Sequence, residues 1–370
     1  MKRYTYILII LFNFIFADES INNRIYYFQS GPNLVSFDIL PDNSTIENIF
    51  SSSQDNIISI ISSGEVSYNN ANNWVGNLTN LNGQDGYWVV TSDVVLINLQ
   101  GLPHASNGYY LYPGANLISY PFNNIQEVGQ ALPFYMYNNL SAIIGQNEAA
   151  LILDGEVAGS LTHFEPNKGY WFLTNNAIPF QYNNPIETDL IYNPNQNTYD
   201  NEQLTLYNQS IMQSVFFIED AFYDGNTITT SDQLLVKCND IIVGARNWSG
   251  NMTDIIAMGN DGYSQTENYC EDLQDVSIFL KRNEILNEMH INGNTKWNNN
   301  NISIIALSNF ELGDINLDDN INITDIIIMI DHIISNNMIT NSHQLMLSDL
   351  NNDEIINITD IIFITDLIIR

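Results

Sequence analysis

The stretch Tyr26-Tyr-Phe-Gln-Ser-Gly-Pro-Asn-Leu-Val-Ser-Phe37 returns as Tyr109-Tyr-Leu-Tyr-Pro-Gly-Ala-Asn-Leu-Ile-Ser-Tyr120, at an offset of 83 residues. A second stretch, Gly76-Asn-Leu-Thr-Asn-Leu-Asn-Gly-Gln-Asp-Gly-Tyr-Trp-Val-Val90, returns at the same offset as Gly159-Ser-Leu-Thr-His-Phe-Glu-Pro-Asn-Lys-Gly-Tyr-Trp-Phe-Leu173. Two matched blocks at one offset indicate a tandem duplication of a unit of about 80 residues. We place the first unit at residues 24–105 and the second at residues 107–183.

Each unit is predicted to be a small, mainly β module. Asn33–Phe37 is a short apolar run, and aromatic and β-branched runs follow a glycine at 86–90 and 169–173, as is typical of strands. Ile46–Phe50 predicts one helical turn, capped by Ser44 or Thr45. The repeated pattern resembles modules of secreted bacterial proteins whose function is unknown, so the resemblance implies no activity.

The repeated aromatic pairs Tyr87-Trp88 and Tyr170-Trp171 have two interpretations. In the first, exposed rings stack on the C–H face of a pyranose, which predicts polysaccharide binding. In the second, the rings belong to the core. Adjacent residues of a strand point to opposite faces of the sheet, so at least one ring of each pair is expected inside, and we favour the core.

A further module is predicted at residues 201–309, after an Asn- and Pro-rich linker at 184–200. Strands are predicted at Gln213–Phe222 and Gln233–Lys237, on either side of a hairpin turn at Tyr223–Asn226. The succession of short strands favours a β-sandwich.

Cys238 and Cys270 both fall in this module. Outside the cytoplasm two such cysteines are expected to pair. The disulfide would stabilise the fold by roughly 3–4 kcal/mol through the lost freedom of the unfolded chain. A metal site is the lesser alternative, because the sequence places no histidine near the two cysteines.

Motifs of catalysis are missing from the sequence. It contains no Gly-x-Ser-x-Gly elbow, no His-Glu-x-x-His and no glycine loop for phosphate. A carboxylate pair for glycoside hydrolysis stays open, with Asp254, Asp261 and Glu267 as candidates in a loop-rich stretch. The alternative is that these are turn and surface residues. We therefore assign no catalytic residue.

The chain is strongly acidic, with a net charge of −32 and 10 Lys and Arg among 370 residues. This balance argues against nucleic acid as a partner. Residues 1–17 combine a basic start, an apolar run from Tyr6 to Phe16 that is too short to span a bilayer, and a small residue at Ala17. They are predicted to be a signal peptide. We expect a secreted or cell-surface protein that does not span the membrane after cleavage.

The C-terminal region contains a second repeat, at an offset of 35 residues. Asp314-Ile-Asn-Leu-Asp-Asp-Asn-Ile-Asn-Ile-Thr-Asp325 returns as Asp349-Leu-Asn-Asn-Asp-Glu-Ile-Ile-Asn-Ile-Thr-Asp360, and an apolar run follows each copy. Oxygen-bearing side chains occupy loop positions 1, 3, 5, 9 and 12, the pattern with which a 12-residue loop binds a hard cation. The alternative is a pair of Asn/Asp turns before helices that Thr324 and Thr359 cap.

These residues resemble the dockerin family, type I-like, of calcium-binding assembly modules. Its loops read Asp-x-Asn-x-Asp-Gly-x-x-Asn-x-x-Asp, and one helix follows each. The resemblance covers residues 311–370 and implies a small α-helical module with EF-hand-like loops, two Ca²⁺ ions and a cohesin-like protein or cell-surface scaffold as partner. It implies that the first ion is held by Asp314, Asn316, Asp318, Asn320 (through its carbonyl), Asn322 and Asp325, and the second by Asp349, Asn351, Asp353, Ile355 (through its carbonyl), Asn357 and Asp360.

Position 6 departs from the family pattern, because its glycine is Asp319 in the first loop and Glu354 in the second. That position needs a left-handed backbone, which Asp tolerates better than Glu. We therefore expect the second loop to bind more weakly or to be distorted. Family members often contact partners through positions 10 and 11, here Ile323-Thr324 and Ile358-Thr359. The alternative is that these isoleucines form the module's own core.

The leading hypothesis is a non-catalytic, secreted or surface-displayed bacterial protein with several β modules and a calcium-dependent attachment module. The runner-up is an O-glycosyl hydrolase, or an accessory module that binds polysaccharide, in an extracellular complex that degrades polysaccharide. The two hypotheses differ in what they expect of the first 310 residues. An enzyme needs a cleft with convergent carboxylates.

Overall fold

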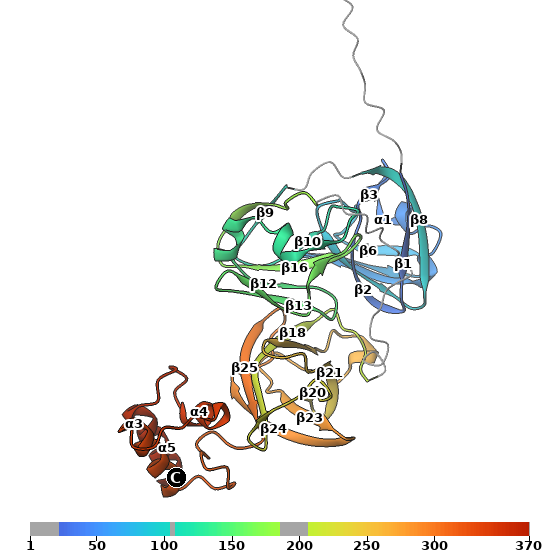
Figure 1. The fold of residues 1–370 in the computed structure, drawn as a ribbon. Helices are drawn as coiled ribbons and strands as arrows, with labels where there is room; N and C mark the ends of the chain where they lie inside the picture. Colours follow the sequence, from blue (N-terminus) through green and yellow to red (C-terminus); the bar gives the residue numbers. More distant parts are fainter. Residues whose placement is uncertain (1–21, 104–107, 186–205, 370) are drawn as a thin grey trace, which may run out of the picture.

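The computed structural model describes residues 22–103, 108–185 and 206–369. The predicted signal peptide and nearly all of the predicted linker therefore lie outside the described residues. The chain is mainly β, and helices α3 (Ile323–Ile333), α4 (Ser342–Ser348) and α5 (Ile358–Ile369) gather at its C-terminal end (Figure 1). Across the described ranges, no helix is long and apolar enough to cross a membrane.

The first unit is an antiparallel β structure with one short helix, α1 (Ile46–Ile49). Its strands are β1 (Asn22–Phe28), β2 (Gly31–Ser36), β3 (Ile39–Leu40), β4 (Ile57–Ser62), β5 (Glu65–Asn70), β6 (Asn73–Gly76), β7 (Gly86–Thr91) and β8 (Val95–Pro103). The main sheet has the order β2-β7-β4-β5-β6, while β8 pairs with β1 and β3. Of the two residues predicted to cap the short helix, the Thr45 side chain accepts the cap hydrogen bond from the Asn48 N–H.

The second unit repeats this architecture. Its strands are β9 (Gly108–Leu111), β10 (Gly114–Ser119), β11 (Gln126–Glu127), β12 (Leu140–Ile144), β13 (Ala149–Leu153), β14 (Glu156–Gly159), β15 (His163–Phe164), β16 (Gly169–Thr174) and β17 (Ile178–Gln181), with helix α2 (Val128–Ala131) and the 3-10 helix η2 (Phe134–Asn138). The main sheet has the order β10-β16-β12-β13-β14, and β9 pairs with β17. The main sheet therefore has the same strand order as that of the first unit.

The residues that both copies share have matched roles at the start of each unit. The Asn33 amide donates to the carbonyls of Gln29 and Gly31 and accepts the Gln29 N–H, which holds the turn before β2. Asn116 makes the same bonds to Tyr112 and Gly114 before β10. Since these bonds satisfy backbone groups of the turn, both copies need asparagine there.

The two units pack through a pseudo-symmetric interface. The Ser36 N–H donates to the Asn167 carbonyl at 3.0 Å, and the aligned Ser119 N–H donates to the Gln84 carbonyl at 2.9 Å. The two serine hydroxyls also donate across this boundary, to the carbonyls of Lys168 and Gly83. The core of the interface is formed by a leucine and a tryptophan from each unit: Leu34, Trp88, Leu117 and Trp171.

The glycine of the repeated Gly-Tyr-Trp motif lies where β7 and β16 approach each other. A Cβ on Gly169 would lie 3.2 Å from the Gly86 Cα, and one on Gly86 would lie 2.6 Å from Leu117 Cδ1. A side chain at either position would push the units apart. The motif is therefore explained by contact between the copies.

The interpretation of the repeated aromatic pairs as sugar-binding platforms is wrong. Tyr87, Trp88 and Tyr170 are buried, and Trp171 is half-buried. The Tyr87 hydroxyl accepts the Asn82 N–H at 2.8 Å, and the Tyr170 hydroxyl accepts the Glu165 N–H at 2.9 Å. One ring of each pair thus anchors a loop inside its own unit, and the other packs between the units.

The third module is a curled sheet rather than the two facing sheets of the expected sandwich. Its strands are β18 (Gln213–Tyr223), β19 (Asn226–Thr227), β20 (Gln233–Cys238), β21 (Ile241–Asn247), β22 (Thr253–Met258), β23 (Ser277–Arg282), β24 (Ile285–Gly293) and β25 (Ile302–Ser308). The order is β19-β18-β25-β24-β23-β20-β21, and β22 pairs with β18. The sheet turns at β24, which pairs first with β23 and then with β25.

The core of this module continues into the second unit. Ile144 and Leu151 belong to the same buried cluster as Val215 and Phe217. Gly159 leaves room for this contact, since a Cβ there would lie 2.9 Å from a ring carbon of Phe217. The third module and the second unit are therefore joined by apolar packing as well as by the chain.

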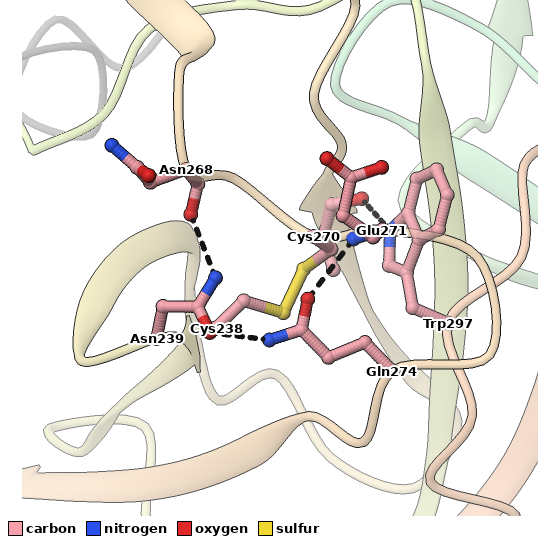
Figure 2. The surroundings of a disulfide bond; sticks show 8 residues. Cys238, Asn239, Asn268, Cys270, Glu271, Gln274 and Trp297 are labelled. Atoms are coloured by element: carbon pink, nitrogen blue, oxygen red, sulfur yellow. Dashed lines mark hydrogen bonds between the residues drawn. A yellow bond between two sulfur atoms is a disulfide. The ribbon is translucent and has the colours of Figure 1, made fainter.

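Cys238 and Cys270 form a disulfide with a Cα–Cα distance of 5.3 Å (Figure 2). It ties the end of β20 to the loop that follows the 3-10 helix η4 (Ser264–Thr266). Side-chain amides reinforce the same link, because Gln274 donates to Asn239 and Asn239 donates to the Asn268 carbonyl. The disulfide therefore stabilises loop structure at one end of the curled sheet.

Candidate metal centre

The first C-terminal loop is organised by two buried carboxylates, Asp314 and Asp325. Asp314 accepts the N–H groups of Asp318 at 3.1 Å and Asp319 at 2.8 Å. Asp325 accepts the Ile315 N–H at 2.9 Å and the Asn322 N–H at 2.9 Å. The loop backbone thus wraps around loop positions 1 and 12, which brings both ends of the loop together.

The second loop has the same arrangement. Asp349 accepts the N–H groups of Asp353 at 3.2 Å and Glu354 at 2.8 Å. Asp360, also buried, accepts the Leu350 N–H at 3.0 Å and the Asn357 N–H at 2.9 Å. The repeat in sequence is therefore a repeat in backbone geometry.

The remaining oxygen-bearing side chains of the first loop bond within the loop. Asn316 accepts the Asp318 N–H, and Asp318 accepts the Asn320 N–H, each at 3.0 Å. The Asn320 carbonyl accepts the Asn322 amide at 3.1 Å. The second loop has the equivalent bonds at its aligned residues, Asn351, Asp353, Ile355 and Asn357.

Position 6 has a left-handed backbone in both loops, with φ of 62° at Asp319 and 63° at Glu354. The sequence predicted this conformation. It also predicted that Glu354 would distort or weaken the second loop, but the backbone of the two loops agrees here. The relative affinity of the loops stays a prediction.

The residues that cap the following helices are asparagines, so the capping role that the alternative interpretation gave to Thr324 and Thr359 is wrong. Asn322 caps α3 by accepting the Thr324 N–H at 2.8 Å, and Asp325 completes a capping box. Asn357 accepts the Thr359 N–H at 2.8 Å in the same way before α5. Thr324 and Thr359 lie two residues beyond the cap position, and their own N–H groups donate the cap bond.

The electrostatics of the first loop favour a cation. Burial raises the pKa of Asp314, hydrogen bonds from the Asp318 and Asp319 N–H groups oppose that rise, and the nearby carboxylates of Asp325 and Asp318 add to it. A bound divalent ion would relieve this repulsion. Within the described part of the chain, no three His, Cys, Asp or Glu side chains gather as a metal site. In each loop, three of the six expected donors are carboxylates and three are amide or carbonyl oxygens.

The donor set suits calcium. The side chains and carbonyls that the two loops offer are all oxygen ligands, from carboxylates, amides and the backbone, as a hard cation requires. The left-handed residue at position 6 makes the turn that such a loop needs. The residues present therefore fit Ca²⁺ in both loops.

The helices that follow the loops pack against each other (Figure 1). Their buried core is small and apolar, and it consists of Ile315, Ile326, Met329, Ile339 and Ile364. Ile323 and Ile358 do not belong to it, since they are 62 % and 64 % exposed. The interpretation of these two isoleucines as core residues is therefore wrong.

The exposed isoleucines continue along both helices. On α3 they follow Ile323 at helical spacing, and on α5 they follow Ile358 in the same way. We call these two rows the isoleucine stripes. They consist of Ile323, Ile327, Ile330 and Ile334, and of Ile358, Ile362 and Ile369.

The helical region is attached to the curled sheet through a buried histidine that the sequence did not mark. The His343 ring stacks on Phe222 at 4.8 Å between centroids, and its Nε2 lies 2.7 Å from the Ser308 hydroxyl. Asn352 of the second loop exchanges two amide hydrogen bonds with Asn292 of β24. A lone histidine in a chain rich in Asn carries no signal of this role.

The catalytic candidates have structural roles. Asp254 is buried and accepts the Ser160 N–H, the Ser160 hydroxyl and the Arg246 guanidinium, at 2.7–3.0 Å. Asp261 accepts bonds from its own turn and from the Ile211 N–H. Glu267 is exposed. The bonds of Asp254 join the second unit to the third module, and those of Asp261 lie within the third module.

No family model matches this chain, and no curated protein or solved structure matches it either. The resemblance to dockerins therefore rests on the loop residues quoted above.

Proposed function

We propose that this chain is a non-catalytic, extracellular bacterial multi-module protein that attaches to a partner protein through a calcium-dependent, dockerin-like C-terminal module. The β modules precede the attachment module and are held to it by His343. The observation that carries the proposal is the match between the two loops, which share hydrogen bonds, the left-handed position 6 and the exposed isoleucine that follows.

Two Ca²⁺ ions would be held by the residues of the two loops. Asp314 and Asp325 would supply carboxylates to the first ion, and Asp349 and Asp360 to the second. Each loop begins beside the helical core, so an ion that pulls the loop ends together also holds its helix in place. Metal binding and folding of this module are therefore expected to be coupled.

The isoleucine stripes support a protein partner. Exposed apolar rows on two neighbouring helices are costly in water and mark interaction surfaces. The two rows begin at aligned residues, Ile323 and Ile358, directly after the loops, so calcium would fix their positions. A cohesin-like protein or a cell-surface scaffold with an apolar face is the partner that this surface fits.

The test has two arms. Calorimetric titration of the chelator-treated full chain with Ca²⁺ should show two sites, and an Asp325→Ala, Asp360→Ala double variant should show none. The full chain should then capture a partner from the extracellular fraction in Ca²⁺ but not in chelator, and an Ile323→Ser, Ile358→Ser variant should fail to capture it. Absence of heat and of thermal stabilisation on adding Ca²⁺ would refute the proposal. If the native chain and the Ile323→Ser, Ile358→Ser variant both bind calcium and capture the partner equally, the isoleucine stripes do not bind the partner.

The enzyme form of the runner-up, a glycoside hydrolase, gains no support from the aspartates that the sequence marked as candidates. Such an enzyme needs two carboxyl groups that face each other across a substrate. Asp254 and Asp261 instead accept hydrogen bonds from neighbouring backbone and side chains.

A further inference from the structure

A shallow groove of about 800 Å³ lies on the second unit, along β9 and β17. Tyr135 of η2 forms one side of it, and Gln84 reaches it from the first unit. Grooves of this size, at a boundary between modules and lined by aromatic residues, are typical ligand sites. The described residues that line it are Gln84, Gly108, Tyr109, Tyr110, Tyr135, Ile178, Pro179, Phe180 and Gln181.

These lining residues are all uncharged, in a chain whose net charge is −32. An acidic protein of this kind repels anions, and the groove offers no cation to hold one. The surface combines aromatic faces with amide and hydroxyl groups. It therefore suits a neutral ligand with both apolar and hydroxyl-bearing faces.

Two of the aromatic rings that line the groove are exposed and held in place. Tyr110 is 57 % exposed and Tyr135 is 43 % exposed. The Tyr135 hydroxyl donates to the Pro179 carbonyl at 3.3 Å, which holds its ring beside β17. The Tyr110 ring packs edge-on to Tyr112 at 5.2 Å between centroids. Rings that are fixed before binding lose little freedom when a ligand stacks on them.

The first unit provides an internal comparison, because it has the same fold with a ring at only one of the two positions. Tyr27 aligns with Tyr110 and is 49 % exposed, whereas no ring aligns with Tyr135. Ser52 aligns with Tyr135, and Leu96 of β8 aligns with Pro179. The fold does not require the groove's aromatic side, since the first unit folds without it. The Tyr135 ring is therefore a feature of the second unit that the fold shared by the two units does not require.

We propose that this groove binds a neutral polysaccharide of pyranose units, which stacks on Tyr110 and Tyr135. The C–H face of a pyranose matches an exposed aromatic ring, and its hydroxyls match the Tyr110 hydroxyl. An open groove, rather than a closed pocket, admits the middle of a long chain. The site is distinct from the buried Tyr-Trp pairs, and it does not depend on the calcium loops.

The test uses the full chain and a panel of neutral hexasaccharides with β-1,4-linked glucose, xylose or mannose units. Titration calorimetry should show binding to at least one of them, equally in Ca²⁺ and in chelator. Tyr110→Ala and Tyr135→Ala should each weaken that binding by about tenfold or more. Tyr27→Ala, at the aligned position of the first unit, is the matched control and should leave it unchanged.

Circular dichroism and thermal melting show whether each variant is folded, and Tyr110→Phe should retain binding because it keeps the ring. The proposal is overturned if no hexasaccharide binds at millimolar concentration, or if binding survives both alanine variants. Loss of binding in chelator would also overturn it, since the groove would then not be the site. None of these outcomes depends on whether the C-terminal module binds calcium.

Discussion

In the repeat at an offset of 83 residues, the shared leucine and tryptophan, Leu34 and Trp88 in the first copy, lie where the two copies meet and are buried there. In the repeat at an offset of 35 residues, the shared isoleucines Ile323 and Ile358 are on the surface. In each repeat, one copy packs against the other. The copies of the first repeat meet at Gly86 and Gly169, and those of the second meet where α3 packs against α5. A shared residue that this pairing buries is explained by the fold. A shared residue that stays exposed calls for a partner outside the chain.

The largest expected effect is at the inward-facing repeat. Trp88→Ala removes a buried ring from the interface between the units and should lower the free energy of unfolding by about 3–5 kcal/mol. Calorimetric melting of the full chain checks this, with the exposed Tyr27→Ala as a control that should change stability by no more than about 0.5 kcal/mol. If both variants melt alike, the two units do not stabilise each other through this interface.

Removal of calcium should have the next largest effect, and it should be confined to the C-terminal region. At a free Ca²⁺ concentration of about 100 times the dissociation constant, each site adds about 2.7 kcal/mol to stability. Hydrogen exchange should therefore show faster exchange in α3 and α5 on adding chelator, while β7 and β16 stay protected. If exchange also becomes faster in β7 and β16, the stability of the β units depends on calcium binding at the C-terminal loops.

Acid should weaken the joint between the helical region and the curled sheet. Burial lowers the pKa of His343 to about 4, and the nearby Asp224 opposes this shift. Since the ordinary value is 6.5, the unfolded chain binds more protons than the folded chain between these values. Stability is therefore lost as the pH falls from about 6.5 to 4, by on the order of 1 kcal/mol.

His343→Gln is the variant that isolates this effect. The ring of His343 contacts Phe222, Phe310 and the Ser308 hydroxyl, and Asp224 is the carboxylate that acts on its pKa. Carboxylates away from this joint are the same in both chains and contribute equally to the pH dependence of each. In the native chain, α4 should lose protection from hydrogen exchange between pH 7.5 and pH 5. In the variant, this loss should be smaller. An equal difference in both would show that His343 does not carry the pH dependence.

The sequence predicted the repeats better than it predicted which way their residues face. The duplication and the strands at 33–37, 86–90 and 169–173 follow from local pattern, and the structure confirms them. The burial of Trp88 depends on Leu117, which lies in the other unit. A local sequence pattern does not predict a contact between residues far apart in the chain. The stacking of His343 on Phe222 could not be predicted for the same reason. The sandwich prediction failed similarly, because nothing local marks the turn of the sheet at β24.

The smallest expected effect on stability is at the outward-facing repeat, and there it is the most informative. Ile323→Ser and Ile358→Ser change exposed side chains, so each should alter the free energy of unfolding by no more than about 0.5 kcal/mol. Each should nevertheless reduce calcium-dependent partner capture, and the double variant should abolish it, because the isoleucine stripes begin at these residues. Val75→Ser, at an exposed apolar residue of β6, is the matched control and should capture normally. A double variant that melts several degrees lower would instead place these isoleucines in packing, and the contrast between the two repeats would then be lost.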